Sequence, residues 1–307
     1  MKKILIFGGS GLVGSKFIDL FKNIFDINKF VSYEIKSPLA AEVDILNKDV
    51  IAKTIQEFNP DTVINFAAYT QVEEAEAQKG NKEGMCYQIN AMGAKNVALS
   101  CKEFDKKLIH ISTEYVFDGT KENSPYSEED KPNPVNWYGQ TKLFGEQFVL
   151  ESGCPAVIVR ICMPFSAFYE LKKDVARFFL EELKAGRKIK AIEDQRVTPT
   201  NVSDIANALQ VMLESETTGL YHVSSTDSVT PLEFAKNIAE EFNLNYSLIS
   251  PVDFDEYNEK KKAKLLKFSW LNPTKFEREF GEGILHTVEE GLALFKKEID
   301  AESANRL

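Results

Sequence analysis

The chain has 307 residues, of which 43% are hydrophobic, and 37 basic against 47 acidic residues give a net charge of 37 − 47 = −10. This composition predicts a folded α/β domain with room for a smaller lobe and excludes wholesale disorder. The acidic balance argues against a nucleic acid or an anionic membrane as a partner, and no apolar run approaches the roughly 20 residues of a membrane span.

The first half of the chain alternates between expected strands and expected helices. Short apolar runs predict strands at residues 3–7, 30–34, 62–65, 108–112 and 156–161, and amphipathic segments predict helices at 11–23, 50–58, 85–104 and 136–150. Residues 118–134 are polar and contain proline, which indicates an ordered surface loop. The alternation is typical of βαβ units, so we expect a Rossmann-type, doubly wound parallel sheet with a smaller C-terminal substrate lobe.

The last third of the chain is less regular. Helices are expected at residues 174–185 and 202–213, and a strand at 220–223. A further helix should open at Thr230, with Pro231 in its first position and Glu233 completing a capping box. We expect the dinucleotide-binding domain at residues 1–162 with 197–228. The substrate lobe should then comprise residues 163–196 with 229–307.

A glycine-rich turn follows the first expected strand. Gly8, Gly11 and Gly14 stand where a strand gives way to a helix, and Gly9 frees the turn further. Such a turn lets the backbone approach a pyrophosphate, which the helix N-terminus attracts through its free amides. The sequence therefore predicts a dinucleotide cofactor.

An acidic residue lies 20 positions beyond Gly14. Glu34 is expected to end the second strand and to accept hydrogen bonds from ribose hydroxyls, which favours NADH. Lys36 lies two residues further and suits a 2′-phosphate instead. The cofactor is thus NAD(H) or NADP(H), and the choice stays open.

Tyr138 and Lys142 are spaced to lie on one face of a helix. An ammonium beside a phenol lowers the phenol pKa from its usual value of about 10, so Tyr138 is expected to be unusually acidic. With a dinucleotide nearby, this pair supplies the acid–base half of a hydride-transfer enzyme. The interpretation requires both groups to stand near the glycine turn.

The motifs resemble those of the extended short-chain dehydrogenase/reductases, and within them the dTDP-4-dehydrorhamnose reductases. The matching stretches are IFGGSGLVG at 6–14, DTVINFAAYT at 61–70, HISTEYVFDGT at 110–120 and NPVNWYGQTKLFGE at 133–146, with VTPTNVSDIA at 197–206. The resemblance implies an NAD(P)-dependent reductase of the 4-keto group of a nucleotide sugar.

The resemblance also implies roles for individual residues. Thr113 would hold the keto oxygen, Tyr138 would protonate it, and Lys142 would bind the nicotinamide ribose. The implied cofactor contacts are Gly8, Gly11, Leu12, Val13, Gly14, Glu34, Asp44, Ile45, Ala67, Ala68, Tyr69 and Lys142. The implied substrate contacts are Val72, Thr113, Glu114, Tyr115, Tyr138 and Met163. A homodimer is an expectation from the family.

Some positions depart from the family pattern. Met163 stands where a tryptophan is usual, and Leu265–Leu266 replace an Arg–Pro pair, so the particular sugar nucleotide is left open. The family usually has aspartate in place of Glu114. Neither the four cysteines nor the histidines form a metal-like pattern, and no metal is expected.

Two alternatives remain open. The same fold and motifs occur in the regulatory beta subunit of methionine adenosyltransferase, which binds a dinucleotide but serves as a partner subunit. An epimerase or dehydratase of the same superfamily is the other, although dehydratases carry an Asp–Glu pair where this chain has only Glu114.

Overall fold

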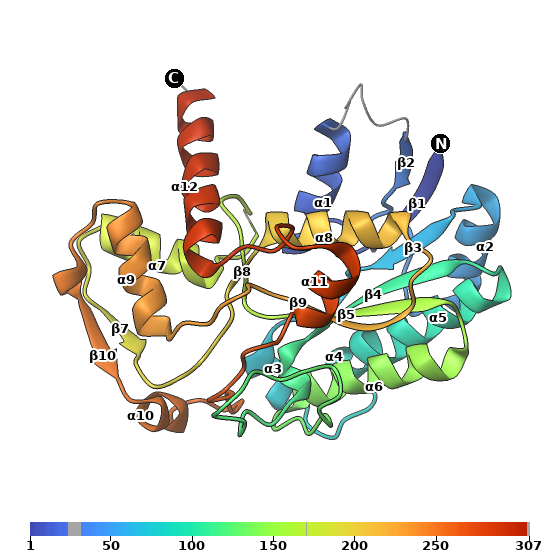
Figure 1. Ribbon diagram of the computed structural model, residues 1–307. Helices are drawn as coiled ribbons and strands as arrows, with labels where there is room; N and C mark the ends of the chain where they lie inside the picture. Colours follow the sequence, from blue (N-terminus) through green and yellow to red (C-terminus); the bar gives the residue numbers. More distant parts are fainter. Residues whose placement is uncertain (24–31, 170, 306–307) are drawn as a thin grey trace. The chain divides into compact units, whose positions relative to one another are not determined.

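The computed structural model describes residues 1–23, 32–169 and 171–305 (Figure 1). The described chain divides into two compact units. The first comprises Met1–Asp118, Lys131–Arg160 and Leu209–Tyr221, and the second comprises Gly119–Asp130, Ile161–Ala208 and His222–Leu307. The domain boundaries expected from the sequence stay a prediction, because a compact unit is not by itself a cofactor or substrate domain.

The central sheet confirms the expected Rossmann-type fold. Its strands are β1 (Lys2–Phe7), β2 (Tyr33–Lys36), β3 (Thr62–Asn65), β4 (Lys107–Thr113), β5 (Ala156–Ile161) and β9 (Gly219–Val223), in the order β2-β1-β3-β4-β5-β9. The pairs β1–β2, β1–β3 and β3–β4 are parallel. The chain moves outward from β1 to β2 and then returns to place β3 on the other side of β1. Ligands of such sheets bind at this reversal, beyond the carboxyl ends of the strands.

Helices cover both faces of this sheet. On one face, α2 (Lys48–Phe58), α5 (Ala94–Glu103) and α6 (Trp137–Ser152) pack against the strands in a cluster that includes Leu5, Val63 and Leu108. Figure 1 shows α1 (Leu12–Asn23) on the other face, where Phe17 is fully buried. The strand β1 could be predicted from its apolar run because Ile4–Phe7 are all buried, at most 2% exposed.

Side-chain caps fix the ends of the helices that carry the sequence motifs. Asn47 caps α2 by accepting from the Val50 amide, and Asn136 caps α6 by accepting from the Gly139 amide at 2.9 Å. Gly153 ends α6 in the left-handed region, at φ 68°. The predicted helix at 136–150 is therefore confirmed, and its start is set by a polar side chain.

The helix predicted over 85–104 is interrupted. The structure has α4 (Met85–Tyr87), a π-helical segment η1 (Gln88–Gly93) and only then α5. Sequence periodicity missed this change of pitch because it affects two turns at most. Such π segments are often found at functional sites, and this one carries the buried Asn90.

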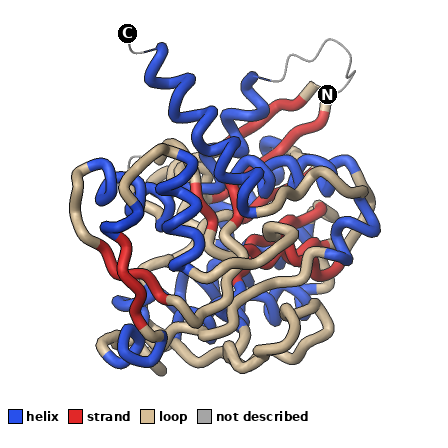
Figure 2. Tube along the Cα trace, turned by 60° about the vertical axis from the view of Figure 1, so that its left-hand side comes forward, coloured by secondary structure: helices blue, strands red, loops and turns tan. Residues whose placement is uncertain are grey.

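The second unit has its own core and two small sheets. β7 (Ile189–Ile192) pairs in parallel with β10 (Ile249–Val252), and β6 (Pro164–Phe165) pairs with β8 (Thr200–Asn201). Figure 2 shows the strands in red between the blue helices. Its apolar cluster includes residues of α7 (Val175–Lys184), α9 (Pro231–Glu241) and α12 (Val288–Asn305). The predicted capping box at Thr230 and Glu233 is confirmed. These short strands were not predicted, since two to four residues carry too little pattern.

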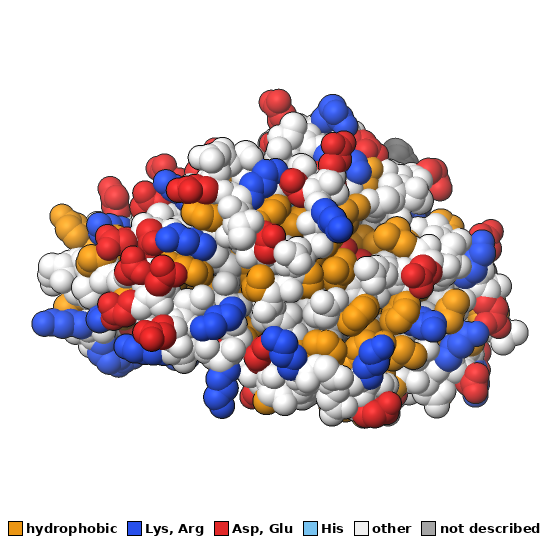
Figure 3. All heavy atoms as spheres, turned by 90° about the horizontal axis from the view of Figure 1, so that it is seen from below, with side chains coloured by type: hydrophobic (Ala, Val, Ile, Leu, Met, Phe, Trp, Pro, Cys, Tyr) orange, Lys and Arg blue, Asp and Glu red, His pale blue; other side chains and the backbone are white. Residues whose placement is uncertain are grey.

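The helix α8 (Val202–Glu214) confirms a predicted helix. The remaining elements are short: α3 (Val72–Glu76), η2 (Glu114–Val116), η3 (Tyr246–Leu248), α10 (Phe254–Glu259) and α11 (Thr274–Phe280). None of the helices in the described ranges is long and apolar enough to cross a membrane. On the face drawn in Figure 3, acidic and basic side chains lie among one another, so the negative charge is not concentrated in one patch there.

Candidate active site

The glycine turn sits at the carboxyl end of β1, against the end of β3. Gly8 has φ 76°, and a Cβ atom added there would lie 2.6 Å from the Ala67 Cα. A Cβ on Gly14 would lie 2.8 Å from the Gly8 carbonyl oxygen. The Gly11 amide donates to that same oxygen at 3.0 Å, which closes the turn before Leu12 and Val13 begin α1. The turn therefore brings backbone amides and the α1 N-terminus to the switch point of the sheet.

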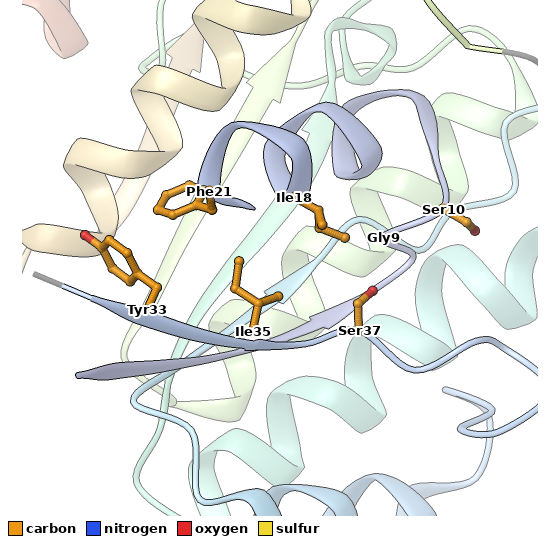
Figure 4. A pocket seen from close by; sticks show the side chains of 7 residues that line it. All are labelled: Gly9, Ser10, Ile18, Phe21, Tyr33, Ile35 and Ser37. Carbon is orange, nitrogen blue, oxygen red and sulfur yellow. The ribbon is translucent and has the colours of Figure 1, made fainter. Parts of the chain in front are cut away.

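An open pocket of about 430 Å³ lies beside this turn. It is lined by Gly9, Ser10, Ile18, Phe21, Tyr33, Ile35 and Ser37, from the turn, α1 and β2. Figure 4 shows Ser10 and Ser37 at one end, next to Gly9, and the rings of Phe21 and Tyr33 at the other. The polar end of the pocket thus adjoins the turn expected to hold a pyrophosphate.

The prediction that Glu34 ends the second strand is wrong. The strand runs Tyr33–Lys36, because its register with β1 pairs Lys3 with Glu34 and Leu5 with Lys36. Glu34 forms an exposed ion pair with Lys3 at 3.4 Å. A side chain on Gly9 would instead meet the Ser37 hydroxyl. The first two residues of the predicted strand, Phe30 and Val31, lie outside the described residues.

The remaining predicted cofactor contacts are held by asparagine side chains. Asn96 donates to the carbonyl oxygens of Ile45 and Leu46, each at 3.1 Å, just after Asp44. Asn65 accepts from the Ala67 amide at 3.1 Å. These bonds fix two loops at the carboxyl edge of the sheet.

Asn90 in the π-helical segment holds the loop after β3. Its side chain accepts from the Tyr69 amide at 2.8 Å and donates to the Tyr69 carbonyl at 3.1 Å. It also donates to the Thr141 hydroxyl on α6 at 3.0 Å. Asn90 therefore ties the predicted cofactor loop, which includes Ala68, to the helix of Tyr138 and Lys142, and sequence reasoning missed it.

Tyr138 lies buried near the end of β4. Its ring meets Tyr115 edge to face at a centroid distance of 5.5 Å. Thr113, the last residue of β4, donates from its hydroxyl to Glu114 Oε2 at 2.6 Å and is also hydrogen-bonded to Tyr138. The structure thus brings together Thr113, Glu114 and Tyr138, as the sequence predicted.

The prediction of an acidic phenol is wrong. Burial, together with the negative charge of Glu114, raises the pKa of Tyr138 above its usual value, and the hydrogen bond with Thr113 only partly offsets this. The phenol is therefore fully protonated near neutral pH. Such a group is a proton donor and not a base.

Lys142 is buried one turn along α6 from Tyr138. Its ammonium donates to the carbonyl oxygen of Ile111 on β4 at 2.6 Å. Burial lowers the pKa of Lys142 to about 8, and the charge of Glu146 works against that fall. The ammonium has three N–H donors, so one bond to Ile111 positions it and leaves donors for a ligand.

Three of the six predicted substrate contacts share one apolar cluster. Tyr138 belongs to it, and Val72 and Tyr115 pack against it, as does Tyr69, a predicted cofactor contact. Met163 lies in the other compact unit, where its backbone has φ 41° and its side chain packs against that core. The role of Met163 therefore stays a prediction.

A buried ionic network was missed by sequence reasoning. Arg160 on β5 donates twice to the Glu146 carboxylate, at 2.9 and 2.7 Å, and Ser112 donates to it at 2.5 Å. One signal was available, because Arg160 is the only charged residue in the apolar strand AVIVRI. A charge in a buried strand requires a buried partner.

His110 is packed inside the sheet. It is completely buried beside Asn65, and burial together with Lys142 holds its pKa well below the usual value. No group of three or more metal-ligating side chains occurs among the residues that the structure describes. His110 is therefore a neutral core residue.

Comparisons with known proteins agree with this fold. A family model described as RmlD substrate binding domain matches residues 1–300. The chain is 30% identical over 292 residues to a dTDP-4-dehydrorhamnose reductase of Aggregatibacter actinomycetemcomitans, covering 92% of this chain and 94% of the relative. It is also 30% identical over 257 residues to methionine adenosyltransferase 2 subunit beta of Mus musculus, covering 82% and 75%.

A solved structure is similar over nearly the whole chain. It is the dTDP-4-dehydrorhamnose reductase of Bacillus anthracis in complex with NADP, with a TM-score of 0.85 and 30% identity. The match covers 97% of this chain and 100% of that one.

Proposed function

The chain belongs to the RmlD substrate binding domain family, and we propose that it is an NAD(P)H-dependent reductase of the 4-keto group of a nucleotide-linked deoxy sugar. The observation that carries this proposal is the buried group of Thr113, Tyr138 and Lys142 at the carboxyl end of β4. A structural role alone does not account for a buried lysine whose pKa is lowered, next to a protonated phenol. The named reductase relatives support the same reaction class.

The glycine turn fits a dinucleotide. Gly8 and Gly14 have no space for a side chain, whereas a Cβ on Gly11 would meet only the Gly8 carbonyl oxygen, at 3.2 Å, so the turn is packed on one side and open on the other. Gly11, Leu12 and Val13 would hold the pyrophosphate through the α1 N-terminus, and Lys142 would hold the nicotinamide ribose. When bound, the reduced nicotinamide supplies the hydride.

Tyr138 acts as the general acid. Reduction of a carbonyl needs a proton on the oxygen as the carbon accepts a hydride, and the product is an alcohol. Because burial keeps Tyr138 protonated, it can donate that proton to the oxygen. Thr113 sits beside it. Its hydroxyl donates to Glu114 in this structure, and it would stabilise the developing negative charge by turning to the substrate oxygen.

Turnover with a panel of sugar nucleotides tests the proposal. The purified protein is mixed with NADPH or NADH and with 4-keto-6-deoxy sugars carrying thymidine, uridine or guanosine diphosphate. Loss of the near-ultraviolet absorbance of the reduced cofactor with at least one sugar supports the reductase. If no sugar in the panel is reduced, and the dinucleotide still binds, the reductase proposal fails.

The end of β2 favours NADPH over NADH. The residue that faces the glycine turn is Ser37, a neutral hydrogen-bond donor, and it follows Lys36. Neither repels a 2′-phosphate. We expect the protein to bind NADPH more tightly than NADH. In Ser37→Asp we expect the preference to reverse, because a carboxylate repels the 2′-phosphate and should lower the affinity for NADPH about tenfold or more.

Fluorescence titration with both cofactors measures this preference. Glu34→Gln is the matched control. Because Glu34 is paired with Lys3, this substitution should leave the ratio of the two affinities unchanged. A wild-type preference for NADH that shifts toward NADPH in Glu34→Gln would restore the original assignment of Glu34.

The activity should fall as the pH rises through about 8. Lys142 has a pKa of about 8 in the folded protein and loses its charge above it, so it no longer attracts the cofactor. A pH profile of kcat/KM measures the descending limb. A profile that stays flat to pH 10 would contradict the role of the ammonium.

The lowered pKa of Lys142 affects the stability of the fold in the opposite direction to its effect on activity. The unfolded chain holds the Lys142 proton up to about its usual pKa of 10.5, whereas the folded chain releases it near 8. Between these values the unfolded state binds more protons, so this group alone makes the protein more stable as the pH rises. Lys142→Met should lack this contribution in a comparison of melting temperatures across the window.

A regulatory subunit is the second and weaker candidate function, because the subunit beta of mouse methionine adenosyltransferase is also 30% identical, although over less of the chain than the reductase. In this case the dinucleotide would bind without turnover and the chain would assemble with a larger enzyme. Failure of the sugar panel, combined with a stable complex with a purified methionine adenosyltransferase, favours this function. An epimerase or dehydratase is not favoured by the site, since Glu114 is the one acid next to Thr113.

The substrate class is thus a nucleotide sugar, and the cofactor NAD(H) or NADP(H). A cytoplasmic location and a homodimer remain part of the proposal. Size-exclusion chromatography with light scattering tests the homodimer.

A further inference from the structure

The buried pair of Glu146 and Arg160 is connected to the strand that carries Thr113 through the hydrogen bond from Ser112 to Glu146. Their side chains are only 4% and 3% exposed. Glu146 stands four residues after Lys142, on the same face of α6. Its carboxylate accepts from Ser112, the residue between Ile111, whose carbonyl holds the Lys142 ammonium, and Thr113.

We propose that Glu146 and Arg160 form a positioning pair that sets the protonation of Lys142. Glu146 is the negative group that keeps the buried ammonium charged, and Arg160 limits how strongly it does so. The effect of this pair on catalysis rests on the proposed function. The effect on the charge of Lys142 does not depend on that function.

The charges of the network explain the direction. Lys142 and Arg160 are cations, and Glu146 is the anion that is hydrogen-bonded to Arg160 and raises the pKa of Lys142 from four residues along α6. The neighbouring His110 is held neutral by burial, and burial raises the pKa of the Cys86 thiol, which also acts on Lys142. Arg160 remains charged in proteins, so it does not yield a proton when the balance changes. Lys142 does yield one, since burial already lowers its pKa to about 8. A change at Glu146 or Arg160 is therefore transmitted to Lys142.

The geometry makes this pair rigid. Arg160 binds Glu146 with two parallel bonds, through Nε and Nη2, and its guanidinium carbon lies 5.0 Å from the centre of the Phe117 ring. Its remaining nitrogen, Nη1, has no hydrogen-bond partner among the described residues. Both of these hydrogen bonds run to the same carboxylate, so within the described residues Glu146 is the anion that balances the charge of Arg160.

The test is a direct titration of Lys142 in the full-length chain. Lysine is labelled with carbon-13 at Cε, its signals are followed by NMR against pH, and the Lys142 signal is assigned by its loss in Lys142→Arg. In Glu146→Gln we expect the Lys142 pKa to fall by about one pH unit or more. In Arg160→Gln we expect it to rise. Ser112→Ala, which removes a hydrogen bond and no charge, is the matched control and should leave it in place.

The opposite signs separate charge control from a merely structural role. A variant that loosens the core admits water to Lys142 and raises its pKa toward 10.5, whichever residue is changed. A rise in Glu146→Gln, or no shift in it, therefore overturns the proposal. If Glu146→Gln does not fold, the double variant Glu146→Gln/Arg160→Gln replaces it, and its Lys142 pKa must fall below the wild-type value.

Turnover gives the second measurement. The descending limb of kcat/KM in Glu146→Gln should move to lower pH by the shift seen in the titration, and activity should be regained by lowering the pH. If no sugar nucleotide is reduced by the wild-type chain, the proposed function fails while the NMR titration still decides this inference.

Discussion

Replacing Tyr138 by phenylalanine is expected to lower kcat by about 10²–10⁴-fold, the range typical of a general acid. The hydroxyl is the only group removed. The ring keeps its place in the apolar cluster beside Trp137 and its edge-to-face contact with Tyr115, so the fold should not change. The measurement is steady-state turnover of whichever sugar nucleotide the panel identifies.

Two controls belong to this experiment. NADPH affinity should be unchanged in Tyr138→Phe, because Lys142 and the glycine turn remain. The free energy of unfolding should change by about 1 kcal/mol or less, the value of the lost hydrogen bond with Thr113. Turnover at the wild-type rate would show that the proton comes from another group, and the acid assigned here would be wrong.

The pKa of Tyr138 illustrates where sequence reasoning ends. Helical spacing placed Tyr138 and Lys142 on one face of α6, and the structure confirms that both are buried there. Spacing says nothing of what else surrounds the phenol. Burial and the carboxylate of Glu114 decide its pKa, and both depend on the packing of η2 against α6. Tyr138 keeps its proposed acid–base role, and that role is now specifically that of a proton donor, which carbonyl reduction requires.

The second strand illustrates a limit of a different kind. The distance of 20 residues from Gly14 to Glu34 is a family average, whereas parallel register decides which residue ends β2. The pairing of Lys3 with Glu34 moves the end of the strand to Lys36 and brings Ser37 to the glycine turn. Long periodic helices and buried strands were predictable because their pattern repeats. Register, the π-helical segment at Asn90 and the pair Glu146–Arg160 depend on contacts between distant residues, which one sequence does not display.

Replacing Gly8 by alanine is expected to destabilise the protein by about 3 kcal/mol or more. Gly8 needs its left-handed backbone at φ 76°, and the added methyl would stand 2.6 Å from the Ala67 Cα and 2.8 Å from the Phe66 carbonyl carbon. These are backbone atoms of the loop after β3, so no side chain can turn aside to relieve the contact. Thermal unfolding followed by circular dichroism measures the loss, which should lower the melting temperature by roughly 10 °C.

Gly11→Ala is the matched variant that separates folding from cofactor binding. A Cβ atom there would meet only the Gly8 carbonyl oxygen, at 3.2 Å, and the backbone of Gly11 is not in the left-handed region. The fold should therefore persist close to the wild-type melting temperature, while the methyl projects into the open side of the turn and weakens NADPH binding by about tenfold or more. Full NADPH affinity in a folded Gly11→Ala protein would mean that the pyrophosphate does not lie on this turn. Because the cofactor assignment of Leu12 and Val13 depends on the same approach of the phosphates to the α1 N-terminus, that result would remove them from the site as well.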